Sequence, residues 1–418
     1  MILNKTLLIL SLALIITASP VVSYFEKYVK MDTQSDPASK TVPTTSSQWD
    51  ILKVIKSDLE FLGVSDITLS DKAVLIATIP AINSDKTVAF ISHVDTAPDA
   101  SGDVKEVLRH KITEDHLNYG LWLNDKAQIK PHELVPYLHR TILTSDGSSL
   151  LGVDDKNAVA GAVASVPVFL AMKQRPKIML IFTPDEEVGR SVNNLPIEEL
   201  GIDYMWSFDA QERGSYNIEC FNAAEAWVTI SGHSKHTGHA YKAPRMENAL
   251  TTANMLVTDL FSKYKDPSES SGRQGFVHLQ SFEGNPSETK LLIRIRSFEK
   301  DEYEAMKSDL RKIAENLQQT YDFTKIDLEI DDIYINIRDQ VDDEMVQITR
   351  NAMSRSGWEP QEELLRGGAD CAFLAARGQK CINLATAGRN FHSVTEFTSI
   401  EDLEEIVVVM EHLVKLTI

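Results

Sequence analysis

Three consecutive carboxylates directly follow a stretch that reads as a buried strand. Residues 177–182 are apolar after the leading Lys, and the residues after them read TPDEEVG, with carboxylates at Asp185, Glu186 and Glu187. Neighbouring like charges repel and are costly to desolvate, so an acidic triplet most often lies on a solvated surface loop. At the carboxyl end of a strand in an α/β sheet, where such folds place their sites, bound cations would relieve this repulsion.

Other candidate metal ligands occupy the same position after other predicted strands. Residues 88–92 are apolar and end in His93 and Asp95, which point to the same side of an extended segment. The others are Asp154 and Asp155 after residues 150–153, Asp209 after residues 204–208, and His392, which follows the strand predicted at residues 381–384. Each one alone is usually a cap or a hydrogen-bonded loop residue. Their recurrence indicates a site, and imidazole and carboxylate ligands without thiolate favour two divalent ions, zinc before manganese or cobalt.

Five motifs together resemble those of the peptidase T family, the tripeptide aminopeptidase branch of the di-zinc aminoacylase, dipeptidase and carboxypeptidase superfamily. In chain order they are HVDTAPD at 93–99, GVDDK at 152–156, TPDEEVG at 183–189, RGGAD at 366–370 and NFHS at 390–393. The resemblance runs from about Tyr24 to the C-terminus and includes MDTQS at 31–35. The combination is specific, whereas the HxDT motif alone would indicate only the superfamily.

The resemblance implies a pair of zinc ions that share Asp154 as a bridging carboxylate. His93 and Asp209 would complete one ion, and Glu187 and His392 would complete the other. Such a pair of ions lowers the pKa of a water molecule held between them, which makes that water a nucleophile near neutral pH.

The resemblance also assigns the remaining catalytic roles. Glu186 is the expected general base, which moves a proton from the water to the leaving amine. Asp95 would orient His93 and raise its basicity. His236, at the position of the family's lid histidine, would polarise the scissile carbonyl or stabilise its oxyanion. The alternative is that His236 simply lies on an exposed polar loop. The candidates for holding a substrate carboxylate or backbone are Arg366, Asn248 and Arg296, any of which could instead form a surface ion pair.

Small peptides are the expected substrates, because peptidase T-like enzymes remove the N-terminal residue from tripeptides. The free amino terminus needs an anionic partner, for which Asp185 and Asp99 are the candidates. Three places differ from the family pattern: residues 210–214, which read AQERG where the family tends to have glycines, Arg389 and Thr395. These differences leave the metal set intact and bear on substrate length or side-chain preference.

Two alternative functions use the same residues. A dipeptidase, carboxypeptidase or N-acyl amino acid hydrolase would share the metals and differ in the lid and specificity residues. An inactive protein that only binds metal or peptide would have no need of a general base, so the presence of Glu186 argues against it.

The predicted fold is α/β, with a mostly parallel mixed sheet, helices on both faces and an inserted α+β domain. Strands and helices alternate from residue 154 to 209, which is typical of a parallel sheet. From about residue 226 the order is strand, helix, two strands, helix, strand, as in a ferredoxin-like unit. We therefore expect a catalytic domain in two parts, 24–219 and 334–418, with an inserted domain at 220–333. In the family this module is a lid, and in relatives it is a dimerisation surface, so a homodimer is a further expectation.

Residues 1–23 differ in composition from the rest of the chain. Lys5 precedes the apolar stretch 7–18, and Val21 and Ser23 suit cleavage before Tyr24, so the prediction is a secretory signal peptide. That would place the protein outside the cell or in a periplasm. An uncleaved anchor or an ordinary first helix is the alternative, and the latter would leave a cytoplasmic protein, as is usual in the family.

Composition sets broader limits. The chain has 418 residues, 43% of them hydrophobic, which suffices for the cores of two domains. Its net charge of -19 argues against nucleic acid as a partner. Three cysteines are too few for a disulfide framework, and buried thiols are favoured over a pair between Cys371 and Cys381.

Residues 97–145 show no clear strand and are expected to form a long loop near the site.

Overall fold

The computed structural model describes residues 19–418 and divides them into two compact units. The first unit comprises the residues up to Tyr216 together with Asp343–Gln361 and Asn383–Ile418. The second unit comprises Asn217–Asp342 and Glu362–Ile382. The domain boundaries at 220 and 333 stay a prediction. The second unit also contains the segment that carries the RGGAD motif.

An eight-stranded mixed sheet forms the centre of the first unit. In spatial order its strands are β1 (Asp66–Leu69), β2 (Leu75–Ile79), β8 (Lys177–Thr183), β3 (Thr87–His93), β9 (Tyr204–Ala210), β16 (Cys381–Ala385), β10 (Ser215–Asn217) and β15 (Gln361–Glu362). β3 pairs in parallel with both β8 and β9, whereas β2 pairs antiparallel with β1 and β8. The carboxyl ends of β8, β3 and β9 therefore lie side by side, which confirms the predicted fold class and brings the residues after these strands together.

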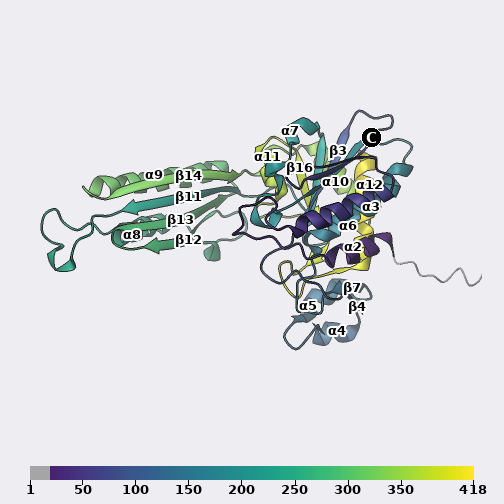
Figure 1. Cartoon of the computed structure of the whole chain (residues 1–418), viewed down its shortest axis with the longest axis horizontal. Helices are drawn as coiled ribbons and strands as arrows, with labels where there is room; N and C mark the ends of the chain where they lie inside the picture. Colours follow the sequence, from purple (N-terminus) through teal and green to yellow (C-terminus); the bar gives the residue numbers. More distant parts are fainter. Residues whose placement is uncertain (1–18) are drawn as a thin grey trace, which may run out of the picture. The chain divides into compact units, whose positions relative to one another are not determined.

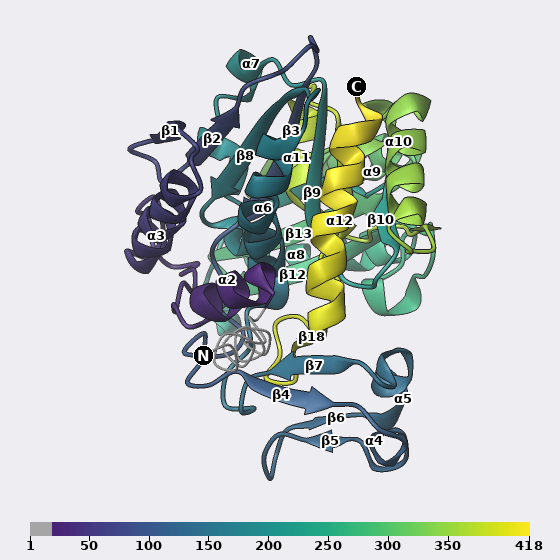
Figure 2. The same cartoon turned by 90° about the vertical axis from the view of Figure 1, so that its right-hand side faces the viewer.

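Several helices pack around this sheet and bury apolar side chains. They are α2 (Pro20–Val29), α3 (Ser47–Phe61), α6 (Val153–Ala171), α7 (Ile197–Leu200), α10 (Asp343–Arg355) and α12 (Ile400–Leu416). α6 is buried on nearly every side, as expected for a helix that is apolar all round. Figure 2 shows α6 and α12 side by side over the strands. Their close approach requires Gly161, because a Cβ there would lie 2.7 Å from a methyl carbon of Ile406.

The expectation of a strandless loop at residues 97–145 is wrong. This part of the chain contains β4 (Leu108–Lys111), α4 (Glu114–Tyr119), β5 (Leu121–Trp122), β6 (Gln128–Ile129), α5 (Pro131–Leu134) and β7 (Thr141–Thr144). β4 and β7 join β17 (Gly388–Arg389) and β18 (Phe397–Ser399) in a four-stranded sheet. These strands are two to four residues long, and runs that short carry too little alternation to be recognised in a sequence.

The second unit has the predicted ferredoxin-like order of elements. Its strands are β11 (Asn222–Ser231), β12 (Phe276–Gly284), β13 (Glu288–Ser297) and β14 (Lys325–Tyr334), arranged as an antiparallel sheet in the order β12-β13-β11-β14. The helices α8 (Ala249–Phe261) and α9 (Lys300–Thr320) lie along this sheet (Figure 1) and share its hydrophobic core. A short helix, α11 (Asp370–Ala376), follows the RGGAD motif.

The structure does not support a signal peptide that ends before Tyr24. Most of the predicted segment, residues 1–18, lies outside the described residues. Tyr24 is inside α2, and Val21 and Val22 just before it are 2% and 1% exposed, so these residues belong to the core. No helix within residues 19–418 combines the length and the apolar character that crossing a membrane requires.

Two of the cysteines are paired in the structure. Cys371 at the start of α11 and Cys381 at the start of β16 form a disulfide, with 2.07 Å between the sulfur atoms. Cys220 is a free, buried thiol, and its burial raises its pKa to about 12. The expectation of three free thiols is therefore wrong, because the fold brings together two residues that the sequence separates by one helix.

Candidate metal centre and active site

His93 is the last residue of β3, and its ring is held between two aspartates. Its Nε2 lies 2.9 Å from Oδ1 of Asp154. Its Nδ1 lies 3.1 Å from the backbone carbonyl oxygen of Asp95 and 3.4 Å from the carboxylate of the same residue. The atom of Asp95 nearest to Nδ1 is its backbone oxygen rather than its side chain, and its role in orienting the ring stays a prediction.

Asp154 stands at the start of α6, where the chain turns sharply. The preceding Gly152 has a φ of +83°, a left-handed conformation that favours glycine. The two carboxylate oxygens of Asp154 face different imidazoles: Oδ1 is near His93, and Oδ2 lies 3.4 Å from Nε2 of His392. A carboxylate arranged in this way can bridge two ions.

Glu186 and Glu187 begin a 3-10 turn, η2 (Glu186–Val188), which follows β8 after Pro184 and Asp185. Their backbone N–H groups donate to Oδ1 and Oδ2 of Asp95, at 2.9 and 3.1 Å. Ligand atoms of Glu186 cluster with those of His93 and Asp209 within 4.8 Å, whereas Glu187 clusters in the same way with His93 and Asp154. The two adjacent side chains are therefore directed to different parts of the site.

Asp209 and His392 reach the same region from β9 and from the loop that follows β17. The backbone N–H of Asp209 donates to Oδ1 of Asn383 on β16, at 3.0 Å. His392 has a φ of +61°, and its Nε2 lies 2.9 Å from Oε2 of Glu187. The structure thus brings together all five predicted ligands, together with Glu186 and Asp95.

The electrostatics of the cluster suit bound cations. Burial, followed by the charge of Asp154, raises the pKa of Glu187 to about 7, and the same two causes raise the pKa of Asp209 well above its usual range. Hydrogen bonds to Asp154 and Glu187 raise the pKa of His392 to about 11. Oε1 of Glu187 is buried and has no hydrogen-bond partner among the described residues. A cation would stabilise the ionised carboxylates and supply a partner for this oxygen, so the residues fit a metal centre.

The structure corrects the expectation that Asp185 could bind a substrate's amino group. Asp185 is 1% exposed, and its carboxylate accepts hydrogen bonds from the backbone N–H and hydroxyl of Thr44 and from Nε2 of Gln48, at 2.5–2.9 Å. Its own N–H donates to Oε1 of Gln48 at 3.1 Å. With a φ of +62°, Asp185 makes the left-handed turn that presents the next two residues to Asp95.

Replacing Asp185 with Asn is expected to lower kcat by about 10- to 100-fold, the usual effect of losing a group that orients a metal ligand. Asn tolerates the left-handed backbone as well as Asp does, but its amide cannot accept all of these hydrogen bonds. Steady-state kinetics would measure the effect, with Thr44→Ser, which keeps the hydroxyl, as the control. A wild-type kcat in the Asn variant would show that the hydrogen bonds of Asp185 are not needed to position Glu186 and Glu187.

Glu396 is a positioning residue that the sequence analysis missed. It is 1% exposed, and its carboxylate accepts hydrogen bonds from the backbone N–H groups of Leu151, Gly152 and Asp154, at 2.6–3.1 Å. Burial raises its pKa to about 8. Glu396 joins the turn before α6 to the segment after His392, a contact between residues more than 240 positions apart that no local pattern could reveal.

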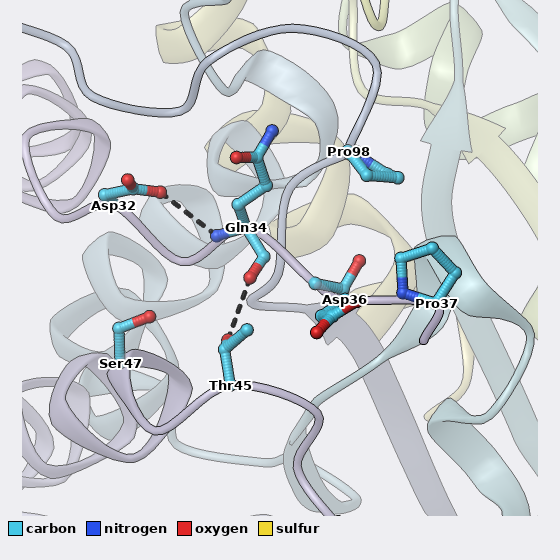
Figure 3. Close-up of a pocket in the computed structure, with 8 residues that line it drawn as sticks. Asp32, Gln34, Asp36, Pro37, Thr45, Ser47 and Pro98 are labelled. Atoms are coloured by element: carbon cyan, nitrogen blue, oxygen red, sulfur yellow. Dashed lines mark hydrogen bonds between the residues drawn. The ribbon is translucent and has the colours of Figure 1, made fainter. Parts of the chain in front are cut away.

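The MDTQS motif at 31–35 lies against the loop that follows β3. Ser35 N–H donates to the carbonyl oxygen of Thr96 at 3.1 Å, and the Thr33 hydroxyl donates to that of Val94 at 2.7 Å. Figure 3 shows the cavity beside this motif, which measures about 600 Å³ and is lined by Asp32, Gln34, Ser35, Asp36, Pro37, Thr45, Ser47 and Pro98. The motif therefore forms one wall of a pocket. Pro98, the residue before Asp99, also lines this pocket.

The predicted substrate-binding residues belong to the second unit, where each has a local partner. Oδ1 of Asn248 caps α8 by accepting from Leu250 N–H at 2.9 Å, and Arg296 donates to the carbonyl oxygens of Ala224 and Ile295. Arg366 donates to the backbone and hydroxyl of residues 270–274 and stacks over Phe221 and Phe276. His236 lies on a loop and accepts from Gly238 N–H at 3.2 Å. Their roles toward substrate stay predictions.

Comparison with known proteins identifies the family. Residues 144–416 match the profile of peptidase family M20/M25/M40. This chain therefore belongs to that family, and it is a metal-dependent peptidase.

Curated relatives that match nearly the whole chain are named peptidase T. Peptidase T of Geobacillus thermodenitrificans (strain NG80-2) is 34% identical over 404 residues, which cover 94% of this chain and 97% of the relative. Peptidase T of Salmonella paratyphi A (strain ATCC 9150 / SARB42) is 34% identical over 406 residues, with the same coverage.

Solved structures share the fold. Aminopeptidase PepT from Bacillus cereus ATCC 10987 superposes with a TM-score of 0.72 at 21% identity, covering 95% of this chain and 98% of that one. The YXEP protein of Bacillus subtilis, described as a dinuclear metal-binding peptidase, has a TM-score of 0.64 at 12% identity, covering 94% and 96%.

Proposed function

We propose that this protein is a dinuclear metal aminopeptidase that removes the N-terminal residue from tripeptides. The observation that carries the proposal is the placement of Asp154, whose Oδ1 lies 2.9 Å from Nε2 of His93 and whose Oδ2 lies 3.4 Å from Nε2 of His392. The peptidase T relatives, at 34% identity over nearly the whole chain, support the substrate class. Zinc suits the mixture of imidazole and carboxylate ligands, with manganese or cobalt as alternatives.

Each residue of the proposed metal centre has a separate role in the hydrolysis. Asp154 would bridge the ions, with His93 and Asp209 on one and Glu187 and His392 on the other. When bound, such ions lower the pKa of a water molecule and make it a nucleophile near neutral pH. Glu186 would accept a proton from the attacking water and return it to the leaving amine. Asp95 holds the ring of His93 and the backbone of both glutamates, so one residue sets the geometry of ligand and base.

The second unit supplies the remaining parts of the proposal. Its ferredoxin-like fold and the loop that carries His236 suit a lid that brings an imidazole to the developing oxyanion on closure. Arg366, Asn248 and Arg296 are the candidates for binding substrate from this unit. A homodimer formed through the same unit is a prediction that needs a measurement of its own.

Hydrolysis of a peptide panel tests the function. We expect the zinc-loaded protein to release the N-terminal residue from free tripeptides and to lose this activity when the amino group is acetylated. The same protein after treatment with a chelator is the control. Activity restricted to dipeptides or acylated substrates would identify one of the other hydrolases on this scaffold, and no turnover with both ions bound would identify a binding protein.

A further inference from the structure

The ring of His392 is less enclosed by the protein than the ring of His93. The side chain of His392 is 43% exposed, whereas that of His93 is 2% exposed. The loop around His392 is also unusual, since Ala387, Asn390 and His392 have left-handed φ angles of +56° to +61°. Such backbone is uncommon for residues other than glycine and often occurs at functional sites. Because packing gives an exposed imidazole little orientation, a ligand role requires a polar partner for its ring.

The two ring nitrogens of His392 have different neighbours. Nε2 lies 2.9 Å from Oε2 of Glu187 and 3.4 Å from Oδ2 of Asp154, the carboxylates of the proposed metal centre. Nδ1 lies 3.4 Å from Oδ2 of Asp99, whose side chain is 60% exposed. A neutral imidazole that binds an ion through Nε2 carries its proton on Nδ1. The carboxylate of Asp99 is therefore placed to accept this N–H group and to select the tautomer that binds metal.

The backbone on both sides of Asp99 is anchored to the MDTQS motif. Nε2 of Gln34 donates to the carbonyl oxygens of Ala97 and Ala100, at 2.9 and 2.5 Å. Ala97 comes two residues before Asp99, and Ala100 directly follows it. The side chain of Asp99 is exposed, but the chain that carries it is held in place, which a positioning role requires.

The HVDTAPD motif thus places an aspartate beside each imidazole of the proposed centre. Nδ1 of His93 faces Asp95, at 3.1 Å from the backbone oxygen and 3.4 Å from the carboxylate, and Nε2 of His93 lies 2.9 Å from Asp154. His392 repeats this arrangement, with Asp154 at Nε2 and Asp99 at Nδ1. Both imidazoles therefore face one shared carboxylate, and each has its own aspartate at the other ring nitrogen.

An exposed carboxylate near the metal centre is also suited to bind a substrate's ammonium group, the role that the sequence suggested for Asp99. The contact with Nδ1 favours positioning, because the ring nitrogen that meets Asp99 is not the one that meets Glu187. A positioning residue affects the affinity for the ion and kcat, whereas a group that only binds substrate affects KM. The two roles are therefore separable by experiment.

We propose that Asp99 is a positioning residue, whose carboxylate accepts the Nδ1–H of His392 and holds the ring with Nε2 directed to the ion that His392 would share with Glu187. The assignment rests on the proposed function for one premise, that His392 is a metal ligand. It also gives the MDTQS motif a task, since Gln34 anchors the backbone around Asp99.

Zinc titration of the full-length protein in competition with a chromogenic chelator tests this role. We expect Asp99→Ala to weaken one of the two zinc affinities by about 10- to 100-fold, the usual effect of removing a group that orients a metal ligand. The ion affected should be the one that His392→Ala weakens. Asp99→Asn keeps an oxygen that accepts the N–H, so it should recover part of the loss. The control is Asp103→Ala, which removes an exposed aspartate of the same loop that pairs with Lys105 and should leave both zinc affinities unchanged.

Tripeptide hydrolysis at saturating zinc supplies a second readout. Asp99→Ala should lower kcat by about 10- to 100-fold and leave KM unchanged, because the substrate does not contact a positioning residue. The Tm of the metal-free variant should equal that of the metal-free wild type, because the Asp99 side chain is 60% exposed. This comparison separates the loss of a metal-orienting group from a general loss of structure.

Wild-type zinc affinities in Asp99→Ala would overturn the proposal, and a raised KM with an unchanged kcat would assign Asp99 to the substrate's ammonium group instead. An equal loss at both ions would also overturn it, because His392 would bind only one of them. If His392→Ala binds both ions like the wild type, His392 is not a ligand and the proposal fails with that part of the metal set. If Asp99→Ala weakens one ion as expected but the wild type cleaves no peptide, the proposed function fails and the role of Asp99 stands.

Discussion

Replacing Glu186 with Gln is expected to lower kcat by about 1,000-fold, within the range of about 10²- to 10⁴-fold that a positioned general base contributes. Gln has nearly the same shape, so the backbone N–H that Asp95 accepts at 2.9 Å stays in place. The amide cannot take a proton from water at neutral pH, and the loss therefore falls on the chemical step. Tripeptide turnover at saturating substrate would measure kcat, and elemental analysis would measure the zinc content.

Glu187→Gln is the matched control, because it makes the same change at the adjacent residue. Glu187 contacts His392 at 2.9 Å, and one of its oxygens is buried without a partner in the described chain, so we expect this variant to lose zinc. The assignment of Glu186 as the base can be contradicted by experiment. Its carboxylate clusters with the ligand atoms of His93 and Asp209, a position from which it could bind an ion instead. Loss of zinc from Glu186→Gln would make Glu186 a ligand and require another base.

Asp154→Asn is expected to weaken the binding of both ions, by more than about 100-fold each. Groups that merely orient a ligand already contribute about 10- to 100-fold to metal affinity, and Asp154 would bind both ions directly. Removing the negative charge from the centre of the site also leaves less attraction for any cation. Zinc titration monitored by competition with a chromogenic chelator would give both affinities.

Thermal unfolding gives an independent measure of the same effect. Ligands that bind only the folded state stabilise it, by about 4 kcal/mol when their concentration is 1,000 times Kd. Zinc should therefore raise the Tm of the wild type, a chelator should lower it, and Asp154→Asn should show little response to either. Asp50→Asn is the control: Asp50 is 67% exposed on α3 and lies 3.4 Å from Nζ of Lys53, so this variant should respond to zinc like the wild type. Two ions bound by Asp154→Asn with wild-type affinity would rule out the bridging role.

The elements that the sequence predicted well are long and strongly periodic. The second unit's strands and helices were found because β11, β13 and β14 are each ten residues long and α9 is 21 residues long, lengths over which amphipathic alternation is distinct. The short strands in residues 97–145 were missed for the opposite reason. Cleavage before Tyr24 was predicted because Val21 and Ser23 precede it, whereas the structure places both residues inside α2 and buries Val21 in the core.

The sequence by itself predicted the group of residues that could form the site, because each follows a predicted strand and parallel strands end at one edge of a sheet. The division of this group into metal ligands and base came from the resemblance to the peptidase T family. Only the tertiary structure decided how their partners are arranged. Asp185 is a buried clamp rather than a substrate ligand, Glu396 holds the turn before Asp154, and Asp99 lies beside His392. These contacts join segments far apart in the chain, and their partners are chosen by packing, which leaves no periodic trace in the sequence.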